Sequence, residues 1–348
     1  MATCEVTEVN SGATFTIDGN EIVLDGALAQ GIDLPHQCRG ASCGTCKARV
    51  LEGDVDHGWS FGLAISDEEK GQGLCLLCQA RPLSATLRVQ TLGVVSGRID
   101  AAEFDAQVLC AVSVTPRVKR VVLALPPSAS VNLPAGCYVE VCLPGISPHR
   151  MYSLAAPFSQ ETGLVELFVA RHHDGRASGF IHNRLGVGDT VRIRGPFGTC
   201  RLPTGCGPIL GLAGGTGLAP VLAIFEAQLQ AGCEEDIVLV LSVREASEVF
   251  ALDRLELLAR RYRNFRYQII VTDEPSRYLA QPMLAPDWIR AHNASLRGYR
   301  AVVSGAPGFV QACVAVCGEL GIDGAHIATD SFTPVAPSVA PIGSESTA

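Results

Sequence analysis

The sequence lacks a surplus of positive charge, and this absence argues against one large class of function. Its 27 Lys and Arg residues stand against 35 Asp and Glu residues, which gives a formal net charge of -8. Binding nucleic acid through the phosphate backbone needs a broad basic face. The local basic run of Arg260, Arg261, Arg263 and Arg266 is typical of the solvated end of a helix. We therefore expect no nucleic-acid partner.

Signals for export and membrane insertion are also lacking. The first ten residues, MATCEVTEVN, have neither the basic start nor the apolar core of a secretory signal. The 24 uncharged residues between Arg201 and Glu226 are interrupted by three prolines and six glycines, so they predict a strand, a glycine loop and a helix rather than a membrane span. We expect a cytoplasmic protein without a membrane partner. Its 14 cysteines then point to metal binding or redox chemistry.

No internal repeat is visible, and three sections differ in their hydrophobic period. Residues 1–92 mix short alternating stretches with one short helical pattern, which predicts a small sheet wrapped on a helix. Residues 103–204 contain six stretches of period two, which suggest an antiparallel barrel. Residues 205–333 alternate strands with helices, as in a doubly wound parallel sheet. Residues 334–348 are typical of a flexible tail.

Four cysteines have the spacing of an iron–sulfur site. Cys38, Cys43 and Cys46 form CxxxxCxxC, and Cys78 follows after 31 residues. This is the plant-type [2Fe-2S] spacing, whereas structural zinc sites favour paired CxxC knuckles. We expect Gly40 and Gly44 to adopt positive φ angles and bring backbone amides toward the sulfur atoms.

Two alternatives remain for these thiols. Cys75 competes with Cys78 as fourth ligand, although it lies in the strongly apolar run LCLLC. All four cysteines can also be unrelated core thiols. Core packing is what we expect for the single cysteines Cys110, Cys137, Cys142, Cys200, Cys206 and Cys233.

Two motifs in the barrel section suit a flavin dinucleotide. In HRMYSLA, Arg150 offers a fork for pyrophosphate, Tyr152 a flat ring, and Ser153 a hydroxyl near the reacting ring nitrogen. An ordinary strand tyrosine beside a surface arginine is the alternative. GRAS, residues 175–178, opens a helix whose free N–H groups can bind a second phosphate, or it is only a helix cap.

Two glycine motifs follow apolar strands in the last section. GGTGLAP, residues 214–220, lets the backbone approach a dinucleotide pyrophosphate, although GxGxxG is absent and a plain tight turn is the alternative. SGAP, residues 304–307, lies at the carboxyl end of a strand, where such sheets bind ligands. Phe332 closes the final strand HIATDSF and can cover a ring.

In this order, the motifs resemble the reductase components of multicomponent aromatic-ring hydroxylating oxygenases. In that family a plant-type ferredoxin module precedes a ferredoxin–NADP reductase-like unit, and the resemblance covers about residues 3–333. It implies a multidomain fold with a β-grasp ferredoxin domain in 1–92, an antiparallel β-barrel FAD domain in 103–204 and an α/β doubly wound NAD domain in 205–333.

The resemblance also implies cofactors and their residues. The [2Fe-2S] ligands would be Cys38, Cys43, Cys46 and Cys78. FAD would contact Arg150, Tyr152, Ser153, Gly175, Ala177 and Ser178, and the nicotinamide cofactor would contact Gly214, Gly215, Thr216 and Gly217. Catalytic roles would fall to Tyr152, Ser153, Ser304 and Phe332, with Ser304 standing where many relatives have Cys. Arg244 also belongs to the cofactor set, but Glu245 beside it favours NADH over NADPH.

The expected activity is electron transfer from NADH through FAD and the cluster to a Rieske-type ferredoxin or terminal oxygenase. Docking to that partner should be weak and small in area. One alternative is the same cofactor chain serving a deoxysugar dehydratase system. Another is a non-catalytic protein that senses redox state through its cluster or binds zinc.

Overall fold

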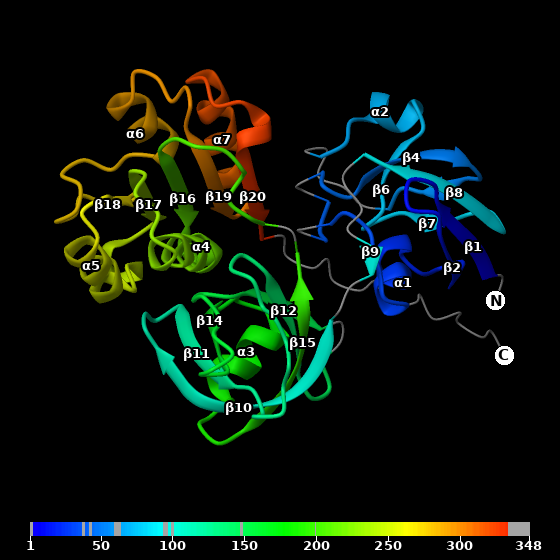
Figure 1. Ribbon diagram of the computed structural model, residues 1–348, viewed down its shortest axis with the longest axis horizontal. Coiled ribbons are helices and arrows are strands. Elements are labelled where there is room, and N and C mark those ends of the chain that lie inside the picture. Colours follow the sequence, from blue (N-terminus) through cyan, green and yellow to red (C-terminus); the bar gives the residue numbers. More distant parts are fainter. Residues whose placement is uncertain are drawn as a thin grey trace, which may run out of the picture.

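The computed structural model describes residues 3–36, 39–41, 44–58, 64–92, 97–98, 101–146, 149–198 and 200–332. These residues form three parts along the chain, coloured blue to cyan, teal to green, and green through yellow to red in Figure 1. Within those ranges, no helix is long and apolar enough to cross a membrane.

The N-terminal domain is a small mixed sheet with a helix packed on it. Its strand order is β2-β1-β8-β4-β6, with β1 and β8 parallel. Helix α1 lies directly on β2, because a Cβ at Gly26 would come 2.1 Å from the Ile17 side chain. Its elements are β1 (Thr3–Glu8), β2 (Ala13–Asp18), α1 (Val23–Ala29), β3 (Ile32–Asp33), β4 (Lys47–Glu52), β5 (Val55–Asp56), α2 (Asp67–Gly71), β6 (Leu74–Leu76), β7 (Arg81–Pro82), β8 (Thr86–Thr91) and β9 (Gly97–Arg98).

The barrel domain contains the six strands that the period-two pattern predicts. Their order is β13-β12-β15-β10-β11-β14, and every pair is antiparallel. A bridge between Leu154 and Leu167 links the two ends of this sheet, so the barrel is nearly closed. Its elements are β10 (Ala102–Ser113), β11 (Val118–Ala124), β12 (Tyr138–Cys142), β13 (Arg150–Ser153), β14 (Leu164–Ala170), α3 (Arg176–Asn183) and β15 (Thr190–Phe197).

The parallel-sheet domain is doubly wound, as expected. Its strand order is β18-β17-β16-β19-β20 with all pairs parallel, so the chain runs from the central strand β16 to one edge and then to the other. The order reverses between β16 and β19, and ligands bind at this switch point in such sheets.

The elements of this domain are β16 (Ile209–Gly214), α4 (Leu218–Gln230), β17 (Ile237–Val243), α5 (Leu252–Arg261), β18 (Phe265–Val271), α6 (Ala285–His292), β19 (Arg300–Gly305), α7 (Pro307–Glu319) and β20 (Ile327–Ser331). The stretch between Arg201 and Glu226 is therefore strand, glycine loop and helix, as the interrupting prolines and glycines predict. Helix α6 is the element of this domain that the sequence reasoning did not anticipate.

Candidate functional site

Two of the four predicted cluster ligands lie at the same end of one strand pair. Lys47 of β4 pairs with Leu76 of β6, so Cys46 just before β4 and Cys78 just after β6 meet at that end. The Leu77 amide also donates a hydrogen bond to the Cys46 carbonyl oxygen, with an N···O distance of 3.1 Å. Both cysteine residues are buried. The other two predicted ligands, Cys38 and Cys43, lie outside the described residues.

The described part of the cysteine loop has an unusual backbone. Gly44 has the expected positive φ angle of 74°. Gly40 is not among the residues with positive φ, and its neighbours Arg39 and Ala41 adopt the left-handed conformation instead, with φ angles of 49° and 58°. Left-handed conformations turn successive N–H groups toward one side of a loop, which suits an anion. Buried thiols combined with such a loop fit a negatively charged [2Fe-2S] group.

Cys75 occupies a different environment from Cys78. It lies within β6 opposite Ala48 and is fully buried. Burial raises the pKa of the Cys75 thiol to about 12, with a further contribution from nearby Cys78. Because a metal ligand must be a thiolate, this environment supports Cys78 as the fourth ligand. The core expectation is wrong for Cys206, which is exposed in the loop before β16.

The proposed flavin residues lie on β13 and at the start of α3. Tyr152 on β13 pairs with Val139 of β12, and burial raises the pKa of its phenol to about 12. The side chain of Arg176, the first residue of α3, donates a hydrogen bond to the Gly145 carbonyl oxygen at an N···O distance of 2.7 Å. Gly145 lies in the loop between β12 and β13, so the GRAS motif and the Arg150 strand are neighbours.

The start of α3 has features of a phosphate site. Its first turn has no side-chain cap, and a Cβ at Gly175 would come 2.4 Å from the Ser178 hydroxyl oxygen. That hydroxyl accepts from the His172 amide at 3.1 Å and donates to the Gly175 carbonyl at 3.2 Å. Ser178 and Ala177 are both buried. The Ser178 hydroxyl is thus occupied by backbone groups of its own turn. The free backbone N–H groups of the first helical turn are the donors suited to phosphate.

The glycine loop after β16 lies at the switch point. Gly214 ends β16, and Gly215, Thr216 and Gly217 form a single 3₁₀ turn that leads into α4. A Cβ at Gly217 would come 2.2 Å from the carbonyl oxygen of Ser304 at the end of β19. Gly215 has a positive φ angle of 54°. Only glycine allows the loop to approach β19 this closely, and the loop lies at the switch point where such sheets bind a dinucleotide.

Residues from the barrel and from the parallel sheet meet beside this loop. The Ser153 hydroxyl of β13 donates a hydrogen bond to Oδ2 of Asp330 on β20 at 2.8 Å, and both residues are buried. Asp330 pairs in register with Ser304. Among the described residues, the buried Ser304 hydroxyl has no hydrogen-bond partner. The Phe332 amide donates to the Gly305 carbonyl at 2.8 Å, which fixes the chain next to the same site.

Asp330 is a site residue that sequence reasoning missed. A carboxylate is unusual near the buried end of a strand, and this was the signal available in HIATDSF. Its partner Ser153 lies 177 positions earlier, so only the fold reveals the pair.

Arg244, placed among the nucleotide contacts, is surrounded by carboxylates. It follows β17 and is exposed. Its backbone amide donates to Glu248 at 3.2 Å, and the Ala246 amide donates to Glu274 at 2.8 Å. Arg117 of the barrel also pairs with Glu248, with an N···O distance of 3.3 Å. Two carboxylates, Glu248 and Glu274, therefore lie at the end of this strand, and Arg117 pairs with the first of them.

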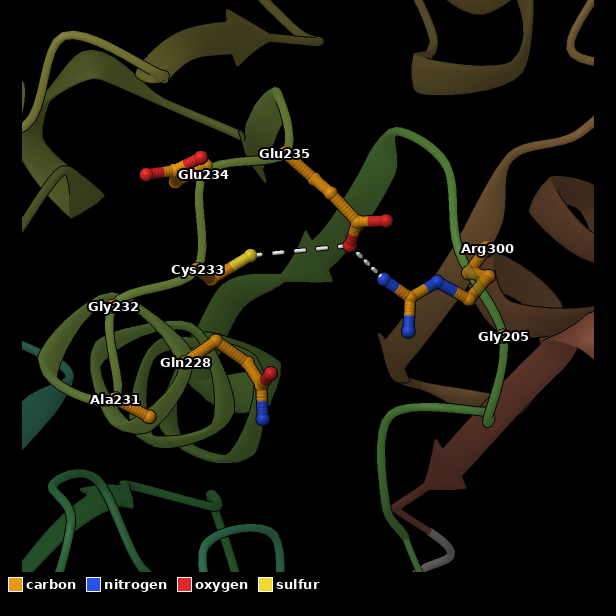
Figure 2. A pocket seen from close by; sticks show the side chains of 8 residues that line it. All are labelled: Gly205, Gln228, Ala231, Gly232, Cys233, Glu234, Glu235 and Arg300. Atoms are coloured by element: carbon orange, nitrogen blue, oxygen red, sulfur yellow. Dashed lines mark hydrogen bonds and ion pairs between the residues drawn. The ribbon is translucent and has the colours of Figure 1, made fainter.

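A pocket of ≈ 300 Å³ opens at the amino end of the parallel sheet, away from the glycine loop. Figure 2 shows Glu235 pointing toward Arg300, with which it forms an ion pair, while Cys233 donates to the same carboxylate at 3.9 Å. The second oxygen of Glu235 accepts from the Gly207 amide at 2.5 Å. The Glu235 carboxylate is therefore already bound by other groups of the protein. No predicted site residue lines the pocket.

The fold and the site together define a three-domain iron–sulfur flavoprotein reductase. Three family models match the chain in that order. A 2Fe-2S iron-sulfur cluster binding domain matches residues 6–83, an oxidoreductase FAD-binding domain matches 105–202, and an oxidoreductase NAD-binding domain matches 212–315. The cofactors of this chain are therefore a [2Fe-2S] cluster, FAD and NAD(P)H.

Comparison with curated proteins and solved structures identifies the family. The chain is 32% identical to the aromatic O-demethylase reductase subunit of Amycolatopsis sp., over 93% of this chain and 97% of that one. It is also 32% identical to the ferredoxin–NAD(P)⁺ reductase component of the naphthalene 1,2-dioxygenase/salicylate 5-hydroxylase systems of Ralstonia sp., over 90% and 93% of the two chains. The crystal structure of the Amycolatopsis cytochrome P450 reductase GcoB aligns with a TM-score of 0.79 at 31% identity, covering 95% of this chain and 99% of that one.

The chain belongs to the family of reductase components of aromatic oxygenase systems. It is an oxidoreductase that transfers electrons from NAD(P)H through FAD and a [2Fe-2S] cluster to an oxygenase system. This membership decides against the alternative of a non-catalytic cluster or zinc protein.

Proposed function

We propose that this chain uses NADH and delivers its electrons to a Rieske-type ferredoxin or terminal oxygenase of an aromatic-ring hydroxylating system. The observation that supports NADH most directly is the acidic surrounding of Arg244. In dinucleotide-binding sheets, the residues at the end of the second strand of the unit contact the ribose 2′ position. Glu248 and Glu274 accept hydrogen bonds there, and their charge would repel the 2′-phosphate of NADPH.

We also propose roles for the site residues. Cys38, Cys43, Cys46 and Cys78 would hold the cluster. Arg150, Tyr152, Ser153, Gly175, Ala177 and Ser178 would hold FAD, and Gly214 to Gly217 would bind the nicotinamide dinucleotide. Ser304 and Phe332 would lie where nicotinamide and flavin meet. The domain limits proposed with them are 1–92, 103–204 and 205–333, and the three family matches fall inside these limits.

The chemistry supplied by the bound groups is simple to state. When bound, the nicotinamide would supply a hydride, and the flavin and the cluster would supply the change from two-electron to one-electron transfer. The residues of the chain orient and enclose these groups. The Ser153–Asp330 hydrogen bond ties the Tyr152 strand to the strand beside Ser304, so it keeps the two binding sites in one arrangement.

Turnover with defined acceptors tests this function. NADH and NADPH are compared as donors, first with ferricyanide and then with purified acceptors. We expect a higher kcat/KM for NADH and efficient transfer to a Rieske ferredoxin with its dioxygenase. Preference for NADPH would overturn the nucleotide assignment. Transfer only to a P450 monooxygenase or to a deoxysugar dehydratase would overturn the partner assignment.

A further inference from the structure

Strand β12 of the barrel buries both of its faces. Val139 and Val141 point into the barrel core. Tyr138 and Glu140 alternate with them on the outer face, yet they are only 4% and 8% exposed. An outer barrel face left to solvent would show polar, exposed side chains at these positions. The outer face of β12 is therefore covered by another part of the protein.

The covering part is the cysteine loop of the N-terminal domain. Arg39, which directly follows the predicted ligand Cys38, forms an ion pair with Glu140 at an N···O distance of 2.5 Å. The other arm of its guanidinium pairs with Asp25 of α1 at 2.8 Å. The Arg39 side chain is 17% exposed and that of Glu140 is 10% exposed. A planar guanidinium can bind two carboxylates at once, so Arg39 links its own domain to the barrel.

A second contact lies beside this pair. Arg194 of β15 donates a hydrogen bond to the carbonyl oxygen of Leu28 on α1 at 3.2 Å. Its guanidinium lies 5.4 Å from the ring centroid of Phe197, and that ring stacks on Tyr138. The His36 ring meets Tyr138 edge-on at a centroid distance of 6.4 Å. In Figure 1, α1 lies on the side of its domain nearest the barrel strands β12 and β15.

The position of this contact within the barrel matters for electron transfer. In the register of the sheet, Tyr138 is directly opposite Ser153 of the proposed flavin strand β13. Arg39 therefore contacts the strand next to the one that contains the proposed flavin residues. Electron transfer slows as the carriers separate, so a contact that fixes this placement would affect the rate from flavin to cluster.

Arg39 itself is held in a strained conformation. Its φ angle of 49° lies in the left-handed region, which costs a non-glycine residue free energy. Such conformations persist where the surroundings compensate, and the two carboxylates provide that compensation here. From this backbone conformation the side chain leaves the loop and reaches Glu140 of the barrel.

We propose that Arg39 is a positioning residue whose ion pair with Glu140 holds the cluster loop against the barrel in the geometry that transfers electrons. This inference rests on the proposed order of carriers. The two electrons still come from NAD(P)H as hydride, and each then passes singly from flavin to cluster. Arg39 gains and loses neither electron nor proton.

The test uses Glu140→Gln in the holoenzyme. Glu140 lies in the barrel, so the change keeps the side-chain shape and leaves the cysteine loop sequence intact. Glu52→Gln is the matched control, because Glu52 also pairs with an arginine, Arg88, but both side chains are more than half exposed. Anaerobic stopped-flow absorbance after mixing with NADH measures flavin reduction and cluster reduction as separate phases. Small-angle X-ray scattering measures the radius of gyration.

For Glu140→Gln we expect an unchanged rate of flavin reduction, cluster reduction slowed by about tenfold, and a larger radius of gyration, because loss of the pair shifts the population toward undocked molecules. Glu52→Gln should match the wild type in all three. Arg39 also pairs with Asp25, and Arg194 lies 3.9 Å from Glu140, so each single change removes more than the shared pair. The double variant Arg39→Gln with Glu140→Gln, with a fully occupied cluster, should therefore slow cluster reduction by less than the product of the two single effects, because both changes remove the same Arg39–Glu140 pair.

Wild-type cluster reduction and an unchanged radius of gyration in Glu140→Gln would overturn the proposal. So would additive slowing in the double variant. A wild-type protein whose cluster accepts no electrons from NADH would instead overturn the proposed function, and this inference with it.

Discussion

One contact of the barrel with the parallel-sheet domain joins Ser153 to Asp330, and one contact with the N-terminal domain joins Glu140 to Arg39. The first contact joins two short side chains on two strands, with both residues buried. The second joins a long arginine in a loop to a carboxylate on a strand. Short side chains on strands allow little relative movement, whereas a loop arginine allows more.

This difference matches what crosses each contact. Hydride transfer forms and breaks bonds, and a displacement of about 1 Å can cost about 100-fold in rate. Single-electron transfer needs proximity but no new bond. The buried Ser153–Asp330 contact therefore suits the nicotinamide side of the flavin, where Arg117 and Glu248 add an ion pair, and the Arg39–Glu140 contact suits the cluster side. Two assays distinguish damage at the two contacts. Ferricyanide reduction measures electron transfer as far as the flavin, and cytochrome c reduction measures transfer as far as the cluster.

The largest effect is expected beyond the second contact, at the cluster itself. Cys78→Ala should abolish cytochrome c reduction and leave ferricyanide reduction intact, because the change removes one thiolate ligand. Cys75→Ala is the matched control and should retain its iron. Iron analysis and visible spectra of both variants provide the measurement. Loss of the cluster in Cys75→Ala with retention in Cys78→Ala would reverse the ligand assignment.

At the first contact, Gly217→Ala should impair both assays. Its Cβ would come 2.2 Å from the Ser304 carbonyl oxygen, so the nucleotide loop must move. We expect kcat/KM for NADH to fall about 100-fold with either acceptor while the cluster remains. The control is Gly318→Ala, because Gly318 lies on α7 with nothing near its Cβ position. Normal kinetics in Gly217→Ala would refute the role of this loop.

Ser153→Ala should have a smaller effect on the same contact. The change removes a hydrogen bond and leaves the buried Asp330 carboxylate without this partner, a loss of about 1–3 kcal/mol. We expect kcat to fall about tenfold with both ferricyanide and cytochrome c. The exposed Ser295→Ala serves as the control. A fall in kcat with cytochrome c alone would show that Ser153 acts on transfer to the cluster. That result would contradict the division of roles between the two contacts.

The smallest effect is expected at the nucleotide ribose. Glu248→Gln removes one negative charge beside Arg244, so kcat/KM for NADPH should rise about threefold, in the range of exposed charge interactions. The value for NADH should change less. Glu256→Gln on α5 is the control, because Glu256 pairs with Arg260. An unchanged NADPH value would show that these carboxylates do not select the nucleotide.

The sequence predicted the elements of the fold because their patterns are local. Alternating residues gave the six barrel strands, and the glycines of 214–217 marked the loop before α4. Helix α6 is short, with Pro286 in its first turn, so its pattern was too weak to notice. Cys206 looked like a core thiol in sequence, but it lies exposed in a loop.

The residues that join the domains were not predictable in the same way. Ser153 and Asp330 are 177 positions apart, and Arg39 and Glu140 are 101 positions apart. Nothing in the sequence near Glu140 indicates that the outer face of β12 is covered. Such partners depend on how folded domains pack, so only the three-dimensional structure reveals them.

The central claim is the order of electron carriers, and an anaerobic titration with NADH tests it most directly. Visible absorbance follows the flavin and low-temperature electron paramagnetic resonance follows the cluster. We predict bleaching of the flavin followed by a rhombic [2Fe-2S] signal, with NADPH the less efficient reductant. An occupied flavin that stays oxidised with both nucleotides, or a cluster reduced without the flavin, would contradict the account.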